Sequence, residues 1–377
     1  MSERGASLRR VREMLRKEMR QLFRDPKTKR IMFLSPILQL VLFGYAVNTD
    51  VHDAKLFVVD LDRTSESRAL VDAFTSGGYF HVAGRSDSPS EMLRALDAGR
   101  AVVGLEIPHG FATDMGARRG ARVQVLVDGT SSNTAVVAQG YATRIVRQFG
   151  MRAAASDASA LGAGVDLRTR AWYNPDLQSR VYNIPAVIGT ILMIMSLLLT
   201  SLAVVREREI GTLEQLMVSP LTPAELMLGK TLPVALIALV DLALVTAVAI
   251  LWFGIPLTGS IFDLLLASTI YIVAALGFGL LISTSSNTQQ EAFMLMFLFF
   301  LPAVVLSGFM YPVDTMPWFF QQLTLLNPVR HFLEIVRGIF LKGTGPRELW
   351  VQYTFLLVTA VSAWTMATWK FARSVRA

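Results

Sequence analysis

Only a few residue patterns in this chain could support chemistry, and most of them are incomplete. Gly229-Lys230-Thr231 matches the end of a phosphate-binding loop, G-x-x-x-x-G-K-[ST], in which backbone N–H groups surround a phosphate. Ala224, however, occupies the first glycine position, and the segment opens an apolar run instead of following a strand. We interpret it as a chance match, so the sequence gives no indication that this chain binds ATP itself.

Metal and nucleophile chemistry is equally poorly supported. His52, His81, His109 and His331 are far apart in the sequence and form no H-E-x-x-H motif or close cluster with carboxylates. The chain has no cysteine, which excludes disulfides and thiolate metal sites. We therefore predict neither catalytic residues nor a metal site, and we do not expect an enzyme.

The most distinctive pattern is a compact charged segment between two apolar runs. Residues 206–216 read R-E-R-E-I-G-T-L-E-Q-L. Gly211-Thr212 is expected to cap a short helix, and Thr222-Pro223 is expected to start the next one with Glu225 in its first turn. Charged residues beside a membrane span offer a surface that a protein outside the membrane can bind. The alternative is a solvated connecting loop.

Helices in a membrane must position these residues, because the composition is too apolar for an ordinary soluble domain. Hydrophobic residues make up 53% of the chain and charged residues 17%. A hydrocarbon core of about 30 Å needs roughly 20 apolar residues in a helix. Six segments meet this length, at about 30–48, 181–205, 230–253, 262–283, 291–311 and 349–371. The first follows a densely charged stretch and lacks a clear cleavage site, so we interpret it as a retained span.

The distribution of basic residues predicts the orientation. Residues 1–30 contain eleven Lys or Arg and four acidic residues, whereas residues 48–180 contain fifteen of each. Lys370, Arg373 and Arg376 follow the last span. The excess of positive charge on the inner side therefore places both termini in the cytoplasm. The net charge of +7 is a consequence of this topology, so we predict contact with anionic lipids and no nucleic-acid partner.

The predicted fold class is an all-α membrane bundle of six transmembrane helices with an inserted small α/β domain. Strands are expected at 55–60, 101–107 and 122–128, alternating with helices at 64–74, 89–96 and 131–155. Residues 1–29 are predicted to form a cytoplasmic amphipathic interfacial helix, and residues 30–48 the first transmembrane helix. Residues 49–180 are predicted to form an extracytoplasmic α/β domain with its connectors. Residues 181–377 are predicted to form five transmembrane helices, with a cytoplasmic loop at 206–229 and an outer re-entrant or amphipathic segment at 312–345. For residues 1–29, a simple basic anchor is the alternative.

Two further patterns concern polar residues near or inside the spans. After Asn327-Pro328, an apolar helix face is expected opposite Arg330, Glu334 and Arg337, whose spacing permits ion pairing. Such a segment fits partial insertion into the outer leaflet better than a seventh span. Asp241 and Gln39 lie inside apolar spans, where polar groups are costly. Asp241 either lines a translocation route or sits protonated or hydrogen-bonded at a helix–helix contact, and the same two alternatives hold for Gln39.

The chain resembles the permease subunit of ABC type 2 exporters, in the bacterial subgroup with a large extracytoplasmic domain between the first two spans. Residues 206–220 follow that family's cytoplasmic loop pattern, E-R-E-x-G-T-L-E-x-L-x-x-[ST]-P. Residues 307–312 (S-G-F-M-Y-P), Met316-Pro317 and the segment from Asn327-Pro328 to Arg337-Gly338 resemble its outer re-entrant segment. The resemblance extends over essentially the whole chain.

The resemblance implies an ATP-driven exporter in the bacterial inner membrane that moves drug-like, lipid or other hydrophobic molecules out of the cytoplasm or inner leaflet. Its implied partners are cytoplasmic ATPase subunits that bind ATP and Mg, a second permease (identical or a paralogue), membrane lipids and a periplasmic adaptor. The implied ATPase-coupling residues are Arg206, Glu207, Arg208, Glu209, Gly211, Thr212, Leu213, Glu214, Leu216, Ser219 and Pro220. The implied outer re-entrant residues are Gly308, Pro312, Pro317, Asn327, Pro328, Arg330, Glu334 and Arg337. The alternative function is a membrane receptor or attachment protein that binds ligands through the α/β domain.

Overall fold

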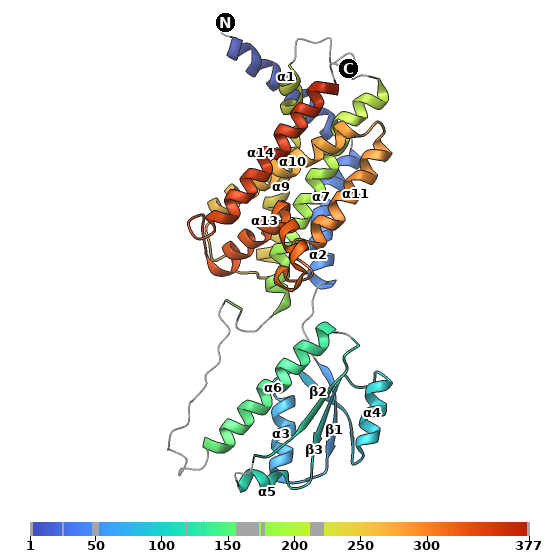
Figure 1. The fold of residues 1–377 in the computed structure, drawn as a ribbon, viewed down its shortest axis with the longest axis vertical. Coiled ribbons are helices and arrows are strands. Elements are labelled where there is room, and N and C mark those ends of the chain that lie inside the picture. Colours follow the sequence, from blue (N-terminus) through green and yellow to red (C-terminus); the bar gives the residue numbers. More distant parts are fainter. Residues whose placement is uncertain are drawn as a thin grey trace. The chain divides into compact units, whose positions relative to one another are not determined.

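The computed structural model describes residues 3–24, 26–46, 53–117, 120–130, 132–155, 173–174, 178–211 and 222–374. The chain forms two compact units, one from residues 1–48 and 171–377 and the other from residues 49–170. In the described ranges, the first unit is built from helices and the second contains the β-strands (Figure 1).

The helical unit is a bundle of long, mostly apolar helices. Its main helices are α1 (Glu3–Arg24), α2 (Pro26–Ala46), α7 (Ser179–Ile210), α9 (Pro223–Leu251), α10 (Ile261–Ser285), α11 (Gln289–Val305) and α14 (Trp350–Ser374). Among the described residues, four helices are long and apolar enough to cross a membrane, namely α7, α9, α10 and α14. The predicted first and fifth spans lie in shorter apolar helices, Met32–Ala46 and Gln289–Val305.

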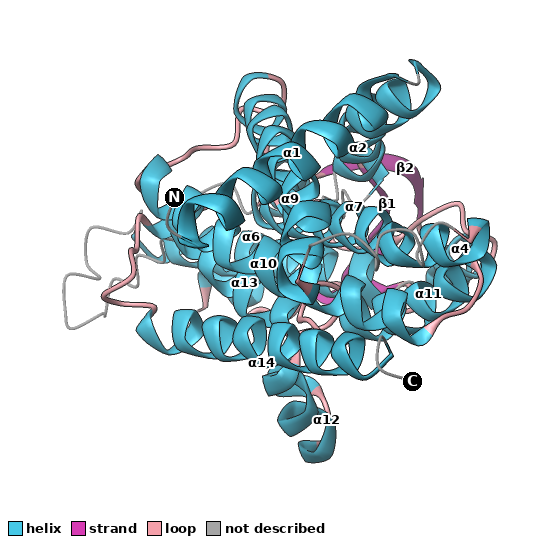
Figure 2. Ribbon diagram, turned by 90° about the horizontal axis from the view of Figure 1, so that it is seen from above, coloured by secondary structure: helices cyan, strands magenta, loops and turns pink. Residues whose placement is uncertain are grey.

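Helix α7 lies at the centre of this unit and packs against α2, α9, α10, α11 and α13 (Figure 2). The hydroxyl of Tyr271 on α10 donates a hydrogen bond to the carbonyl oxygen of Gly189 on α7 at 2.9 Å. Closer to the end of α7, a Cβ atom at Gly279 would lie only 2.7 Å from the Cβ of Thr200. The glycine therefore allows the backbones of α7 and α10 to approach closely.

A series of short helices connects α11 with α14. It consists of η1 (Val313–Thr315), α12 (Trp318–Leu323), η2 (Thr324–Leu326), α13 (Pro328–Arg337) and the π-helical turn η3 (Gly338–Lys342). The Asn327 side chain caps α13 by accepting from the Val329 N–H, and it also donates to the Ala303 carbonyl oxygen at 2.6 Å. The apolar face predicted for α13 is buried, as shown by Phe332 and Val336, both 0% exposed. The prediction of an amphipathic helix here is confirmed.

The second unit contains a four-stranded sheet of order β2-β1-β3-β4. The strands are β1 (Ala54–Asp60), β2 (Phe80–Ser86), β3 (Val103–Ile107) and β4 (Gln124–Val127), and only β4 runs antiparallel to its neighbour. The helices are α3 (Ser65–Thr75), α4 (Pro89–Asp97), α5 (Phe111–Gly116) and α6 (Ser132–Ala155). Because the chain reverses direction across the sheet after β2, right-handed crossovers place α3 and α4 on opposite faces (Figure 1).

Two elements of this unit were not predicted from the sequence. Strand β2 alternates exposed and partly buried residues after its buried first residue, Phe80, and it lies at the sheet edge. It contains few of the β-branched residues that mark a buried strand, so its sequence signal is weak. Helix α5 spans only six residues, too few for a helical period to be recognised.

Candidate functional site

The charged segment that begins at Arg206 continues helix α7 instead of opening a loop. Helix α7 extends to Ile210, and Gly211 ends it in the left-handed conformation with φ of +79°, donating its N–H to the Arg208 carbonyl oxygen. Glycine suits this position because a side chain would be strained at positive φ. Gly211 is thus the C-cap of α7, and the short helix expected after it lies outside the described residues. The predicted site residues Thr212, Leu213, Glu214, Leu216, Ser219 and Pro220 lie outside the described residues.

Three consecutive charged residues at the end of α7 bond to three different parts of the bundle. Glu207 Oε1 lies 3.1 Å from Lys230 Nζ on α9. Arg208 Nη1 donates to the carbonyl oxygen of Ser286, just after α10, at 2.7 Å. Glu209 Oε2 accepts from the side-chain amide of Gln289, the first residue of α11, at 2.8 Å. Successive helical residues point about 100° apart, so this run fastens α7 to α9, α10 and α11 together.

Lys230 is the most buried charge in this region. Its Nζ also lies 3.4 Å from Glu18 Oε1 on α1, and its side chain is 2% exposed against 15% for each carboxylate. The lysine of the phosphate-loop-like sequence is therefore held between two acidic residues. Removing one member of such a buried group leaves an uncompensated charge, at a cost of about 3–5 kcal/mol.

A second pair links α1 to the start of α9. Arg10 Nη2 lies 2.7 Å from Glu225 Oε1, and Arg10 Nε donates to the other carboxylate oxygen at 3.2 Å. Glu225 Oε2 also accepts from the Thr222 N–H at 2.9 Å, while Thr222 Oγ1 accepts from the Glu225 N–H at 3.3 Å. This capping box starts α9, so one carboxylate both orders that helix and holds α1.

We call this set of linked residues the charged junction. Its members are Arg10, Glu18, Glu207, Arg208, Glu209, Glu225, Lys230, Ser286 and Gln289. No sequence pattern directly indicated the roles of Arg10, Glu18 and Lys230. One signal was present, because Glu18 lies three and four residues from Leu15 and Leu22, on the apolar stripe of α1. An acid on such a stripe requires a partner, and Lys230 provides it.

Two other residues of the same segment, Arg206 and Ile210, face away from the charged junction. Arg206 is exposed and forms no hydrogen bond or ion pair with a residue that the structure describes. Ile210 is 62% exposed. The two are four residues apart and therefore share one face of α7. Within the described part of the segment, Arg206 and Ile210 are exposed without a side-chain bond to the bundle, whereas Glu207, Arg208 and Glu209 bond to it, with Glu209 itself exposed.

The predicted outer residues form a separate structure around α13. Gly308 follows α11 with φ of +82°, Pro312 and Pro317 precede η1 and α12, and Asn327-Pro328 begin α13. Arg330 Nε lies 3.5 Å from Glu334 Oε1, as the spacing predicted.

Arg337 does not extend the Arg330–Glu334 ion pair. Its Nη1 donates to the Gly308 carbonyl oxygen at 3.3 Å, and its guanidinium lies 3.8 Å above the Tyr182 ring at the start of α7. Arg337 therefore ties the end of α13 to α7 and to the turn after α11.

The two polar residues predicted inside spans differ in their surroundings. Gln39 on α2 is partly buried, and its Nε2 donates to Ser35 Oγ at 3.4 Å, one turn earlier in the same helix. Asp241 on α9 is 1% exposed, and neither of its carboxylate oxygens has a hydrogen-bond partner among the described residues. The structure thus brings Gln39 to a local partner and leaves Asp241 without one.

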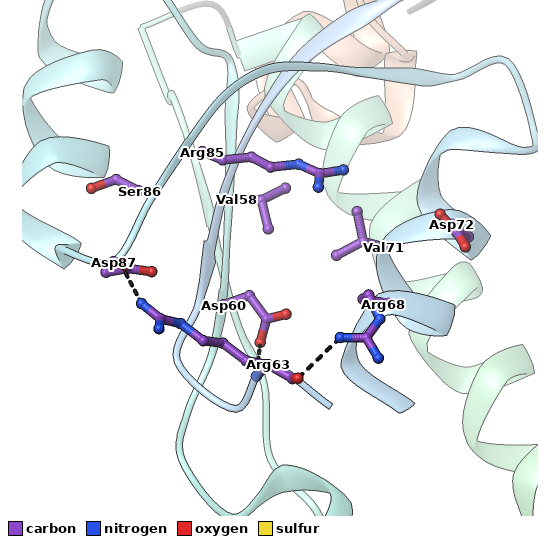
Figure 3. A pocket seen from close by; sticks show the side chains of 9 residues that line it. All are labelled: Val58, Asp60, Arg63, Arg68, Val71, Asp72, Arg85, Ser86 and Asp87. Carbon is purple, nitrogen blue, oxygen red and sulfur yellow. Dashed lines mark hydrogen bonds and ion pairs between the residues drawn. The ribbon is translucent and has the colours of Figure 1, made fainter. Parts of the chain in front are cut away.

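A cleft of about 530 Å³ opens in the α/β unit beside the carboxyl ends of β1 and β2 (Figure 3). Such strand ends are common ligand positions in parallel sheets. In this cleft, Asp60 accepts from the Arg63 backbone N–H at 2.9 Å and from the Ser67 hydroxyl at 2.7 Å. Arg63 also forms an ion pair with Asp87. These contacts organise the loop after β1 and assemble no group of catalytic residues.

Asp62 stabilises the neighbouring turn of the same unit. Its carboxylate accepts from the Gly110 and Ala112 N–H groups at 2.8 and 3.0 Å and from the Thr64 hydroxyl at 2.7 Å. Burial by itself raises the pKa of Asp62, but these hydrogen bonds outweigh it and hold the pKa below its usual value. Asp62 is therefore ionised at neutral pH and acts as a structural acid.

Comparison with known proteins gives matches along nearly the whole chain. The family model described as ABC-2 family transporter protein matches residues 30–369. The probable multidrug ABC transporter permease YbhR of Escherichia coli K12 is 34% identical over 362 residues, covering 96% of this chain and 98% of the relative. YbhS, with the same description in that organism, is 34% identical over 363 residues, with 96% of both chains covered. The inner membrane transport permease YhhJ of E. coli K12 is 29% identical over 377 residues, covering 95% and 96%.

Proposed function

The chain belongs to the ABC-2 transporter family and is a permease subunit of an ABC exporter whose ATPase sits in a partner subunit, and we propose that the charged junction receives that partner's motion. The observation that carries this proposal is the contrast between exposed residues and bundle-bonded residues at the end of α7. Arg206 and Ile210 face outward, whereas Glu207, Arg208 and Glu209 bond to other parts of the bundle. The residues that would contact the ATPase are therefore direct neighbours, on one helix, of the residues that would pass its movement to the bundle.

In this mechanism the partner ATPases bind ATP with Mg, close, and displace residues 206–220. Because α7 is bonded to α9, α10 and α11, its displacement moves these helices together and does not simply bend α7. The links from α9 to α1 through Lys230 and Glu225 extend the same movement to the interfacial helix. The shared movement changes access to a cavity between this permease and a second copy or paralogue.

The proposed topology has six spans, both termini in the cytoplasm, and residues 49–180 outside the bacterial inner membrane. Helix α1 and the last turns of α14 lie at the same end of the helical unit, which supports a common side for both termini (Figure 1). Helix α2 has 21 residues and is therefore roughly 31 Å long, enough to cross the hydrocarbon core with its polar first turn included. Helix α11 and the turn after it form the fifth span.

The proposed substrates are drug-like, lipid or other hydrophobic molecules, in line with the word multidrug in the names of YbhR and YbhS. The basic residues of α1 would contact anionic lipid headgroups, and the α/β unit would be available to a periplasmic adaptor. These assignments follow from family membership and from the position of charge along the chain.

Co-purification of the partner ATPase tests the docking surface. The double variant Arg206→Ala, Ile210→Ala should reduce the amount of co-purifying ATPase about tenfold, equivalent to 1.4 kcal/mol of binding free energy. An Arg347→Ala variant, which changes an exposed arginine of the outer connection, serves as the matched control. Equal ATPase recovery from both variants, with normal membrane insertion, would contradict this docking surface.

A further inference from the structure

Five buried polar side chains on α7, α9 and α10 have no hydrogen-bond partner among the described residues. They are Ser196, Thr200, Asp241, Thr246 and Ser268, none more than 5% exposed. Other hydroxyls on the same helices satisfy themselves by donating to a carbonyl one turn earlier, as Thr190 does to Ala186 at 3.1 Å. Unsatisfied polar groups are costly at membrane depth, so this concentration on three adjacent helices requires an explanation.

Three of these side chains lie at the contact between α7 and α10. Tyr271 of α10 bonds to Gly189 of α7, and Gly279 lies against Thr200, so the two helices run parallel with a known register. Ser268 precedes Tyr271 by three residues, and Ser196 precedes Thr200 by four. Residues at these spacings share one helix face. Ser196, Thr200 and Ser268 therefore line the α7–α10 contact at successive depths.

Asp241 faces the same region from α9. Val234 and Ala238 of α9 belong to one buried cluster with Ile272 and Leu276 of α10. Asp241 follows Ala238 by three residues and so lies on nearly the same face of α9. Helix α9 starts where α7 ends, at the Lys230–Glu207 pair, and therefore runs opposite to both α7 and α10. Because the two helices run in opposite directions, Asp241, one turn after Ala238 on α9, lies at the level of the α10 turn before Ile272. That turn contains Ser268.

Among the described residues, no cation forms an ion pair or hydrogen bond with Asp241. The apolar stretches of α2, α7, α9, α10, α11 and α14 contain no Lys, Arg or His before the polar ends of the helices. An identical second copy has the same helices and brings no cation on them either. An ionised carboxylate in such surroundings is expensive unless a positive charge reaches it.

The basic residues of α13, which packs against α7, α10 and α14, bond to groups other than Asp241, although Arg330 Nε and Arg337 Nη2 have no hydrogen-bond partner among the described residues. Arg330 contacts Glu334 and Thr324, and the ring of His331 bonds to the Leu325 carbonyl oxygen at 2.9 Å. Arg337 is held by Gly308 and the Tyr182 ring. Asp241 is therefore either protonated or paired with a positive charge that a bound molecule brings.

We propose that Asp241 binds the positive charge of an exported organic cation, and that Ser196, Thr200 and Ser268 line its path between α7, α9 and α10. The free hydroxyl oxygens accept hydrogen bonds from N–H groups of the cation or from its water, and the surrounding Leu, Val and Ile side chains contact its apolar body. The proposal deepens the proposed function, since it names the substrate class of the permease.

Tetraphenylphosphonium and tetraphenylborate provide matched probes, because they share size and hydrophobicity and differ in the sign of the charge. Equilibrium binding of each ion is measured on the purified permease with its partner ATPase, in wild type, Asp241→Asn and Asp241→Glu. Wild type should prefer the cation about tenfold or more, Asp241→Asn should lose that preference, and Asp241→Glu should retain most of it. The asparagine side chain preserves size and polarity, so the loss would report the charge.

ATP-driven transport in proteoliposomes separates this proposal from the proposed function. Asp241→Asn should lose export of tetraphenylphosphonium and retain export of the neutral probe calcein acetoxymethyl ester to within about twofold. No cation preference in wild-type binding, or an equal fall for both transported probes, would overturn the cation site. If wild type shows cation preference but no ATP-driven transport, the exporter function fails and the site stands. A preference unchanged in Asp241→Asn with impaired assembly would instead assign Asp241 to contact with the second permease.

Discussion

Helix α9 carries charges in two places, and the protein treats them in opposite ways. In its first turns, Glu225 and Lys230 are bonded to side chains of α1 and α7 that lie far away in the sequence. In its middle, Asp241 is equally buried and has no partner among the described residues. Paired charges fix helices to one another, because moving them apart exposes an uncompensated charge. A carboxyl group without a partner holds no helix against another, and its oxygens remain available to a ligand.

Lys230→Met should break the paired region with the largest effect. The substitution leaves Glu207 and Glu18 close together without their shared cation, so we expect a loss of stability of about 3–5 kcal/mol. Thermal unfolding of the detergent-solubilised permease measures this loss. Lys230→Arg, which keeps the positive charge, should lose much less. Equal melting of Lys230→Met and wild type would show that the junction does not hold these helices.

Glu207→Gln should separate binding of the ATPase from transmission of its movement to the helical bundle. The amide keeps the shape of the side chain but weakens its contact with Lys230, whereas Arg206 and Ile210 stay outward for the partner. ATP-driven export should fall about tenfold, equivalent to 1.4 kcal/mol, while the ATPase still co-purifies. Export per ATP hydrolysed is the quantity to measure. Loss of ATPase binding in this variant would place Glu207 in the docking surface, as the family resemblance implied.

Arg10→Gln tests the more exposed part of the same junction. The Arg10 side chain is 34% exposed against 2% for Lys230, so solvent screens its pair with Glu225. We expect a loss of about 1 kcal/mol or less, which shrinks further as salt is raised. Melting measured at low and high ionic strength checks both points. A salt-independent loss as large as that of Lys230→Met would contradict the ranking.

Asp241→Asn should have the smallest effect on stability, despite the burial of its side chain. The substitution breaks no hydrogen bond to a described residue and removes the cost of holding a carboxylate among apolar groups. Without added cation, the melting temperature should therefore stay the same or rise, a change within about 1 kcal/mol. A loss comparable with that of Lys230→Met would mean that Asp241 is paired in the assembled transporter and would remove the contrast between the two regions of α9.

Much of the framework could be read from the sequence, because it depends on patterns that are local. The apolar stretch at 181–205 lies within α7, the Thr222–Glu225 pair does start α9, and the apolar face of α13 is buried as its period predicted. Each of these features is decided by residues within a few turns of one another, where helical spacing and capping chemistry apply.

The sequence by itself determined that this is a helical membrane protein with a charged segment after the apolar stretch 181–205. Only the tertiary structure decided which residues of that segment face outward and which bond to the bundle. The Lys230–Glu18 contact joins residues 212 positions apart, and no local period reports such a contact. Helical spacing tells which residues share a face, but the neighbour that each face meets is decided by packing. The same packing supplies a partner to Lys230 and leaves Asp241 without one.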